Sequence, residues 1–490
     1  MNVVAEPQWL SKLTKSALNS LSNNKSRTLE GSDEVVVNPA YEQHSDDEIL
    51  GMVEEILSKV YLTDKLREIE DSNRDKFGPR SIAKPWVERK ESLSDYFYED
   101  NYDYDPGGFE ATGGVLRPAT LDMVADNLLS VSSAGLPYMM RKGLVKEHAL
   151  ANWQEQVFTY PCVLYTRTQE SRKTRNVWGY PVSDTIFEQQ YFIPMLSLER
   201  KFPHRAALIG PEEVDAKVSQ LLMGKQNNEI VACVDFSAYD ASVSPSHSFN
   251  AFHEMASYFQ DDYHPSLYDL YRRFVTIGII TPEGEWSGPH GVPSGSSFTN
   301  TIDSMVQWLV AGKPDRCQIQ GDDGIYIVDK SDLDLLRERF KTAGLKLNDS
   351  KSDMFETKEA VYLQRYYHES YPSKTGGLGG VYSAFRAFCR IKYLEKWTDV
   401  GKKKAITGDD FFSLRTITIL ENCKHHPAFT ELVKLAQRLD ERNLEFTSHG
   451  LSAYSKMQES KVRAGVFNQY GLQKGINNFE TVKILRGSGK

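Results

Sequence analysis

The chain has 490 residues, enough for about three domains of ordinary size and for a large buried core. Hydrophobic residues make up 40% of it and charged residues 26%, which argues against a fibrous or wholly disordered chain. No apolar run approaches the ~18 residues that span a bilayer, and the first residues lack the apolar stretch of a secretory signal. Five scattered cysteines without a CxxC pair indicate reduced thiols and no zinc site.

The formal net charge is −9, but the charges are unevenly distributed along the sequence. Residues 91–105 carry six acidic and five aromatic side chains and no Lys or Arg. Residues 141–175 carry seven basic side chains against three acidic ones, and residues 456–490 carry seven against two. An acidic exterior around basic stretches suits a protein that guides a polyanion inward. Ordinary fluctuation of surface charge explains the same composition equally well.

In chain order, the first ~45 residues are expected to form an arm or a partly disordered extension. Apolar residues at helical spacing then predict a helix near 46–60. Between 229 and 368 the pattern predicts a strand, two helices, a strand pair with a tight turn, a third helix with Ser331 as its N-cap and Gly344 at its end, and further strands. Beyond residue 405 the pattern is helical, and the last ~20 residues are expected to be a flexible tail. The fold class is therefore α+β, with acidic residues at the ends of central strands.

Four aspartates lie at the ends of these predicted strands. Asp235 ends the strand 229–236, Asp240 follows five positions later, and Asp322 and Asp323 occupy the turn of the later strand pair. If the two strands are neighbours, Asp235 and Asp322 meet at one edge of a sheet. Mg²⁺ takes one or two protein carboxylates together with water and substrate phosphates. Two such ions ~4 Å apart support phosphoryl transfer.

The tripeptide Gly-Asp-Asp alone is weak evidence, because a chain of this length contains it by chance about one time in ten. A second copy at 408–410 precedes a helical pattern, where acidic residues offset the helix dipole. That copy is interpreted as structural, whereas the first lies between two predicted strands.

Two further clusters lie on either side of the first acidic strand. Ser294 and Gly295 form a loop before a helix that carries Thr299 and Asp303 on one face, although a Ser/Gly loop with a helix cap explains the same pattern. Upstream, basic residues in a strand-like segment suit triphosphate oxygens, with a solvated basic loop as the alternative. These residues are Arg167, Arg172, Lys173 and Arg175.

Taken in order, these segments resemble motifs of viral RNA-dependent RNA polymerases, most closely those of the picobirnavirus and partitivirus group of double-stranded RNA viruses. Seven segments resemble motifs G, F, A, B, C, D and E, in that order. They are SSAGLPY (132–138), RTQESRKTRNVWG (167–179), DFSAYD (235–240), PSGSSFTNTID (293–303), IQGDDG (319–324), LKLNDSKS (345–352) and VYLQRYY (361–367). The resemblance covers about 132–368. One such motif is weak evidence, but seven in the right order are strong.

The resemblance implies a right-hand fold of fingers, palm and thumb, with an antiparallel palm sheet flanked by helices. Its implied limits are an N-terminal extension linking fingers and thumb (1–110), fingers (111–228), a palm with part of the fingers inserted (229–368), and thumb and tail (369–490). Implied partners are template and nascent RNA, rNTPs and a viral capsid protein, with no membrane. A monomer located in the virion interior and host cytoplasm is expected.

The resemblance also implies roles for individual residues. Asp235, Asp322 and Asp323 would hold two Mg²⁺ or Mn²⁺ ions, and Lys351 would donate a proton to the leaving pyrophosphate. Arg167, Arg172, Lys173 and Arg175 would contact the triphosphate. The ribose would be surrounded by Asp240, Ser294, Gly295, Thr299 and Asp303, and template entry would involve Ser133, Ala134, Gly135 and Pro137.

Many relatives of the picornavirus kind have Asn where Asp303 stands, and an ionised Asp accepts but does not donate a hydrogen bond. Three alternatives are kept open. A reverse transcriptase would place a bulky aromatic residue at position 240, where this chain has a carboxylate. An inactive RNA-binding scaffold would have lost Asp235 or Asp322, and a metal-dependent nuclease would need neither the Ser-Gly loop nor the basic strand.

Overall fold

The computed structural model describes the chain except for residues 100, 130, 375, 398–405, 464–474 and 488–490. At its centre lies a four-stranded antiparallel sheet with the order β7-β8-β4-β9. Its strands are β4 (Glu229–Val234), β7 (Cys317–Gln320), β8 (Asp323–Asp329) and β9 (Asp353–Phe355). The register places Val234 opposite Gly324 and Gln320 opposite Asp323, so one edge of the sheet carries the end of β4 and the β7–β8 turn.

Alternate residues of the central strands pack on opposite faces of this sheet, as the pleat requires. On one face, Ala232, Val234 and Tyr326 join a core with three helices, namely α10 (Pro245–Ala256), α12 (Thr299–Val310) and α13 (Leu333–Thr342). On the other, Val231 and Ile325 pack with α8 (Pro211–Met223) and with β10 (Ala360–Tyr362). Burial on both faces explains why these strands are nearly continuous apolar runs.

A second sheet of five strands has the order β1-β6-β5-β2-β3. Its members are β1 (Asn2–Val4), β2 (Cys162–Thr168), β3 (Thr174–Gly179), β5 (Ile279–Thr281) and β6 (Gly284–Ser287). Residues 279–287 thus leave the central region to join strands from before residue 180. Nearby helices are α4 (Trp86–Ser94), α5 (Leu121–Asn127), α6 (Lys142–Gln156), α7 (Val182–Glu199), α9 (Tyr239–Ser242) and α11 (His264–Thr276).

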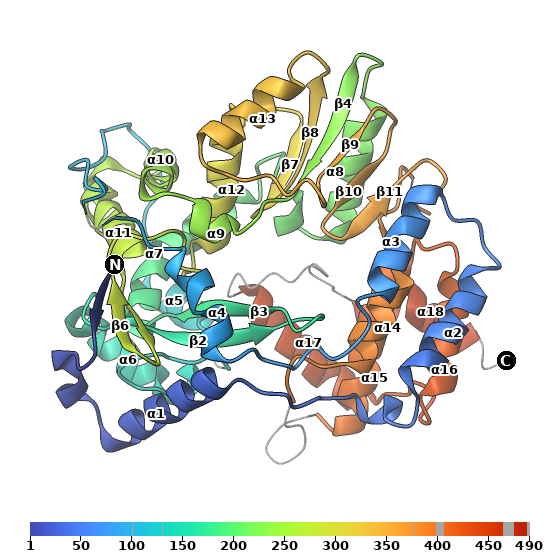
Figure 1. Cartoon of the computed structure of the whole chain (residues 1–490), viewed down its shortest axis with the longest axis horizontal. Helices are drawn as coiled ribbons and strands as arrows, with labels where there is room; N and C mark the ends of the chain where they lie inside the picture. The colour runs from blue at the N-terminus through green and yellow to red at the C-terminus, as the bar shows by residue number, and fades with distance from the viewer. Residues whose placement is uncertain (100, 130, 375, 398–405, 464–474, 488–490) are drawn as a thin grey trace.

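The C-terminal region is helical and follows a small sheet of β10, β11 (Arg365–Tyr367) and β12 (Val381–Tyr382). The helices are α14 (Ala384–Lys392), α15 (Gly408–Leu420), α16 (Phe429–Leu439), α17 (Ser448–Arg463) and α18 (Glu480–Gly487). Figure 1 shows them on the side of the molecule toward which the β2–β3 hairpin points. Among the described residues, no helix combines the length and apolarity needed to cross a bilayer.

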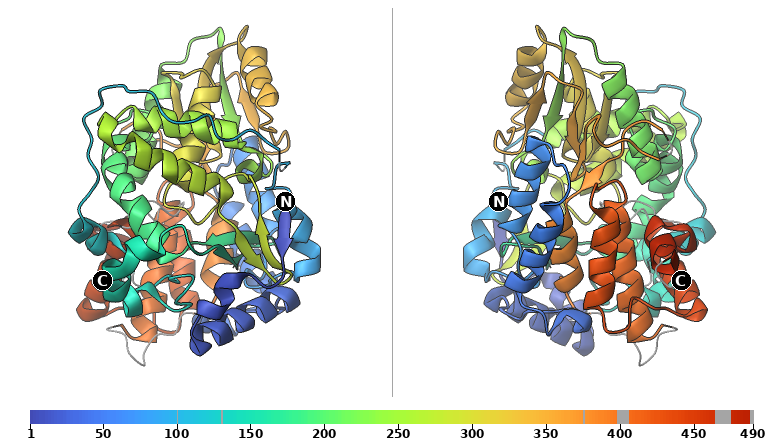
Figure 2. Two further views of the ribbon diagram at one scale, coloured as in Figure 1. Left: turned by 90° about the vertical axis from the view of Figure 1, so that its left-hand side faces the viewer. Right: turned by 90° about the vertical axis from the view of Figure 1, so that its right-hand side faces the viewer.

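The N-terminal segment contacts both of these outer regions. α1 (Lys15–Glu30) and β1 pack on the five-stranded sheet, whereas α2 (Asp46–Leu57) and α3 (Asp64–Arg74) lie against α14 and α16. The blue helices beside the orange and red ones in Figures 1 and 2 are α2 and α3. Glu70 of α3 is fully buried, and it accepts hydrogen bonds from the Ser383 hydroxyl (2.6 Å) and from the Ala384 backbone N–H (2.8 Å) at the start of α14.

Three expectations about elements are corrected by the structure. The first 45 residues contain the ordered helix α1, because Ala17 and Leu21 are buried against the five-stranded sheet. Ser331 does not cap α13, since its hydroxyl donates to Asp329 (2.8 Å) and Asp332 is the N-cap. The described part of the last 20 residues is packed and not a free tail, since Ile476 and Val482 are buried in the C-terminal core. Residues 471–474 and 488–490 of that expected tail lie outside the described residues.

Candidate active site

The acidic edge of the central sheet brings together the aspartates that the sequence placed at strand ends. Asp235 directly follows β4, Asp322 lies in the β7–β8 turn, and Asp323 begins β8. Burial and the neighbouring charge of Asp235 raise the pKa of Asp322. Burial and the charges of Asp322 and Asp235 raise the pKa of Asp323 well above its usual range. The three carboxylates therefore repel one another in a poorly solvated place, which favours binding of a cation.

The turn that carries Asp322 is held from behind by α12. Gly321 adopts φ +66°, a left-handed conformation that suits glycine. Its N–H donates to the Ser304 hydroxyl (2.8 Å), and its carbonyl accepts from the Gln307 side-chain amide (2.9 Å). The Tyr326 hydroxyl of β8 donates to the same Gln307 side chain (2.7 Å). Sequence reasoning missed Ser304 and Gln307, although both lie on the helix that it predicted.

The turn of residues 348–352 is attached to Asp235. The Asn348 side-chain amide donates to the Asp235 carboxylate (3.3 Å), and the Asn348 N–H donates to the Asp235 carbonyl (2.8 Å). The Asp235 N–H in turn donates to the Ser352 hydroxyl (3.2 Å). This places the Lys351 ammonium 3.4 Å from the Asp235 carboxylate, with about half of its side chain exposed. Lys351 is thus within reach of the acidic edge.

The β2–β3 hairpin presents basic side chains to the acidic edge. Arg167 and Arg175 are opposite each other in its register, and Lys173 lies in the tip. Burial, Arg175 and Lys351 lower the pKa of Lys173, while Asp235 and Asp322 oppose that change. The Lys173 ammonium is therefore close to the acids. Arg172 points elsewhere, with its guanidinium 3.6 Å from the Asp33 carboxylate.

The tip of this hairpin also contacts the C-terminal helices. Glu170 forms ion pairs with Arg80 (3.2 Å) and with Arg386 of α14 (3.1 Å). Glu395 pairs with the same Arg80 (2.7 Å) and lies 3.7 Å from Arg167. The charges of Arg386 and Arg80, together with a backbone hydrogen bond, outweigh burial and lower the pKa of Glu170 to about 2. These ion pairs thus hold the tip of the hairpin against Arg80 and α14.

A second pair of carboxyls, Asp240 and Asp303, lies beside the acidic edge. Burial and the charge of Asp322 raise the pKa of Asp240 to about 7. Burial and the charge of Asp240 raise the pKa of Asp303 well above its usual range. The hydrogen bond between the two carboxyls lowers the pKa of Asp240 and raises the pKa of Asp303. Asp303 is therefore the member of the pair that favours the protonated form, in which it donates to Asp240. The expectation that Asp303 accepts a hydrogen bond from the ribose stays a prediction, and a protonated carboxyl donates as an asparagine amide does.

The loop before α12 packs tightly on β3. The Ser294 hydroxyl donates to the Asn176 carbonyl (3.4 Å), and a Cβ on Gly295 would lie 1.6 Å from the Trp178 carbonyl, so only glycine fits there. The Thr299 hydroxyl donates to the carbonyls of Ser296 (3.0 Å) and Pro293 (3.3 Å). Thr299 therefore shapes the loop, Ser294 is bonded to β3, and Asp303 is the residue of this group that interacts with Asp240.

Comparison with known proteins assigns the chain to a protein family. A sequence model described as viral RNA-dependent RNA polymerase matches residues 120–377, slightly more than half of the chain. The chain belongs to the viral RNA-dependent RNA polymerase family. The family assignment made from the ordered motifs is confirmed, and so is the assignment as an RNA-directed RNA polymerase.

Two curated polymerases resemble this one in sequence. A potential RNA-dependent RNA polymerase of a human picobirnavirus is 25% identical over 420 residues, covering 77% of each chain. An RNA-directed RNA polymerase of Cryptosporidium parvum virus 1 is 27% identical over 200 residues, covering 36% of this chain and 37% of that protein. The crystal structure of a human picobirnavirus RNA-dependent RNA polymerase superimposes with a TM-score of 0.80 at 22% identity, covering 99% of this chain and all of that one. The right-hand fold is confirmed, whereas the limits of fingers, palm and thumb stay predictions.

The second Gly-Asp-Asp of the polymerase is structural, as expected. It begins α15, where the Thr407 hydroxyl accepts from the Asp410 N–H (3.2 Å). The Asp409 carboxylate pairs with Arg442 (2.7 Å), and Asp410 accepts from the Thr447 N–H (2.6 Å). Both acids therefore have local partners.

The segment expected at template entry packs against the start of α7. Ala134 is fully buried, and its carbonyl accepts from the Val182 N–H (2.8 Å). Gly135 has φ +63°, Pro137 is in a cis peptide bond, and the Ser133 hydroxyl lies 2.8 Å from the Tyr165 hydroxyl.

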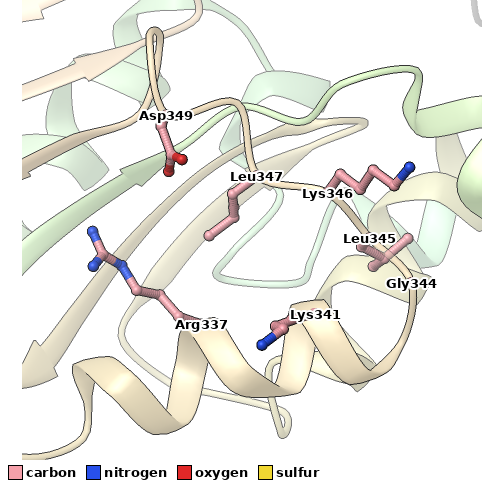
Figure 3. Close-up of a pocket in the computed structure, with 7 residues that line it drawn as sticks. All are labelled: Arg337, Lys341, Gly344, Leu345, Lys346, Leu347 and Asp349. Atoms are coloured by element: carbon pink, nitrogen blue, oxygen red, sulfur yellow. The ribbon is translucent and has the colours of Figure 1, made fainter.

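A pocket of about 380 Å³ lies outside the acidic site, between α13 and residues 344–349. Figure 3 shows the side chains of Arg337, Lys341 and Asp349 around it. The chain that forms its wall continues into the 348–352 turn, but none of the proposed catalytic acids lines it.

Proposed function

We propose that this polymerase replicates and transcribes a viral RNA genome by adding rNTPs to a growing RNA strand and releasing pyrophosphate. The observation that supports this most is the meeting of Asp235, Asp322 and Asp323 at one sheet edge, opposite the basic β2–β3 hairpin. An acidic edge suits divalent cations, and a facing basic hairpin suits the triphosphate of a nucleotide.

We infer that Asp235 and Asp322 hold two Mg²⁺ or Mn²⁺ ions, with Asp323 assisting. Within the described part of the chain, no three His, Cys, Asp or Glu side chains are placed to hold a metal by themselves. The donor set nevertheless fits Mg²⁺, which takes one or two carboxylates and completes its shell with water and phosphate oxygens. When bound, such ions activate the attacking hydroxyl and stabilise the leaving oxygen.

The protein groups around the edge have distinct tasks in this proposal. Lys173 and Arg175 bind and orient the triphosphate, with Arg167 behind them on β2. Asp240 accepts a hydrogen bond from a ribose hydroxyl, and Ser294 and Asp303 complete that network. Thr299 acts through the loop, because its hydroxyl is bonded to loop carbonyls.

Lys351 is proposed as the proton donor to pyrophosphate. Its ammonium lies 3.4 Å from the Asp235 carboxylate on a turn tied to that residue by Asn348 and Ser352. A positioned general acid contributes typically about 10²–10⁴-fold to such a step. Because the side chain is half exposed, it can move from Asp235 to a leaving oxygen without unpacking any core.

The remaining expectations concern partners and place. Template RNA, nascent RNA and rNTPs are the proposed ligands. A viral capsid protein is the proposed protein partner of a monomeric enzyme in the virion interior and host cytoplasm. Co-sedimentation with assembled capsids would test the proposed binding to the capsid protein directly.

Incubation of the purified chain with an RNA template, rNTPs and Mg²⁺, without primer, tests the function. Labelled product of template length is expected, and Asp235→Ala or Asp322→Ala is expected to abolish it while the variant stays folded. Asp409→Ala, in the second Gly-Asp-Asp, is the matched control and is expected to stay active. Product from dNTPs alone would favour a reverse transcriptase, and RNA binding without synthesis would favour an inactive scaffold.

A further inference from the structure

The acidic and aromatic segment 91–105 is not used by the proposed mechanism, yet part of it lies against the ribose side of the site. After α4 ends, residues 96–98 run antiparallel to residues 289–291. The Tyr96 carbonyl accepts from the Gly291 N–H (2.8 Å), the Tyr98 N–H donates to the Pro289 carbonyl (2.8 Å), and Phe97 pairs with His290. Three consecutive residues are thus fixed by backbone hydrogen bonds.

The stretch 289–292 that receives this segment is itself attached to Asp240. The Val292 N–H donates to the Asp240 carbonyl (2.7 Å), and a Cβ on Gly291 would lie 2.3 Å from that carbonyl oxygen. Glycine at 291 therefore lets two backbones approach closely. Tyr96 is hydrogen-bonded to Gly291, which touches Asp240, so backbone contacts determine the position of Tyr96 relative to Asp240.

The ring of Tyr96 has a rigid support on its other side. Its centroid lies 5.8 Å from that of Trp178, which is fully buried on β3, three residues beyond Arg175. The hydroxyl has no hydrogen-bond partner among the residues that the structure describes, although the residue is half-buried. A hydroxyl held in such a place without a partner leaves a hydrogen bond free for a ligand.

The charges around this hydroxyl identify the space that it faces. Burial raises the pKa of Tyr96 well above its usual range, the nearby acidic groups of Asp240 and Asp303 raise it further, and Arg175 lowers it. The backbone bond from Gly291 to Tyr96 and the close approach of Gly291 to Asp240 place Tyr96 on the same side of the site as these groups. The neighbouring Tyr98 hydroxyl differs, because it donates to the backbone carbonyls of Ala241 and Ser242 (3.3 Å each).

We propose that Tyr96 is a specificity-determining residue whose hydroxyl hydrogen-bonds the sugar hydroxyls of the incoming ribonucleotide together with Asp240. This inference rests on the proposed ribose site. It assigns part of nucleotide selection to the N-terminal segment, outside residues 120–377 that match the family. A polar group that bonds a substrate hydroxyl discriminates against the analogue that lacks this hydroxyl, because the polar group is then left without a hydrogen-bond partner.

The test is single-nucleotide addition on one RNA template, with kcat/KM measured for ATP, 2′-dATP and 3′-dATP. Tyr96→Phe keeps the ring and its packing on Trp178 and removes only the hydroxyl. We expect an unchanged melting temperature and a preference for ATP over at least one deoxynucleotide that narrows about threefold to tenfold. The deoxynucleotide affected identifies the sugar hydroxyl that Tyr96 contacts.

Tyr102→Phe is the matched control, because Tyr102 belongs to the same segment and its hydroxyl lies 2.9 Å from the Ser246 hydroxyl of α10, at an exposed position. It should leave both ratios unchanged. Asp240→Ala separates the inference from the function on which it rests. If Asp240→Ala narrows the preference and Tyr96→Phe leaves both ratios within twofold of wild type, the role of Tyr96 is overturned. If Asp240→Ala also changes nothing, the proposed ribose site itself is wrong, and the inference falls with it.

Discussion

Replacing Asp303 by asparagine is expected to stabilise the metal-free polymerase at alkaline pH and to leave its selection of ribonucleotides intact. In the wild type, Asp303 keeps a proton and donates it to Asp240. An asparagine amide makes the same donation without a titrating group. The substitution therefore removes one buried carboxyl and preserves the hydrogen bond.

The pH dependence of stability at this pair follows from the pKa of Asp240. A carboxyl whose pKa is raised by folding contributes stability that is fully present below its unfolded pKa and is lost as the pH rises through the folded value. For Asp240 the pKa rises from 3.8 to about 7. At 1.36 kcal/mol per unit this is about 4 kcal/mol, lost between about pH 4 and pH 7. Asp303, whose pKa is also raised, extends the loss to higher pH.

Urea unfolding in EDTA at several values between pH 5 and pH 8 measures this. The free energy of unfolding of Asp303→Asn should fall less steeply with pH than that of the wild type. At pH 8 it should exceed the wild-type value by on the order of 1–3 kcal/mol, the worth of a hydrogen bond to a charged group. Asp409→Asn, at an exposed ion pair, should stay within about 0.5 kcal/mol. Parallel pH profiles for wild type and Asp303→Asn would refute the shared proton.

Lys351→Leu should slow single-turnover nucleotide addition by ~10²-fold or more, and Lys351→His should recover part of the rate with a lower pH optimum; an unchanged rate in the Leu variant would remove Lys351 from the mechanism. Glu70→Ala leaves the start of α14 and the buried His426 without their carboxylate partner, so it should lower the free energy of unfolding by about 3–5 kcal/mol. Glu68→Ala, at an exposed position, should lower it by less than about 1 kcal/mol in the same urea titration. Glu170→Gln weakens the contact of the hairpin tip with Arg386, so steady-state titration should show a KM for rNTPs raised severalfold over wild type, with a smaller difference at high salt. An unchanged KM would separate that contact from nucleotide binding.

The sequence predicted those parts of the site that depend on local signals. The buried strand before Asp235 and the tight turn at Asp322 are encoded by neighbouring residues, and their register follows once the strands pair. The helix of Asp303 could be placed from its apolar spacing. The ionisation of Asp303 could not be predicted, because it depends on burial beside Asp240, a residue 63 positions earlier in the chain.

The parts that the sequence did not predict depend on contacts between distant segments. Nothing around Tyr96 indicates that its backbone pairs with Gly291, and the acidic composition of 91–105 suggested only a charged exterior. The last helix was mistaken for a tail because its glycines mark flexibility locally, whereas its order comes from packing against α16. Ser331 was mistaken for a cap because Asp329 competes for its hydroxyl.

The contact of Glu70 with α14 also constrains when an active enzyme can exist. Its partners Ser383 and His426 follow it by 313 and 356 residues. During synthesis at about 5–20 residues per second, roughly 20–70 s pass before the last of them is made. Until then the Glu70 carboxylate lacks the partners that make its burial favourable, and α2 and α3 lack the helices against which they pack. The early helices α2 and α3 are thus among the last to find their place, so we expect that a ribosome-bound chain cannot copy RNA before α14 and α16, against which they pack, have been made.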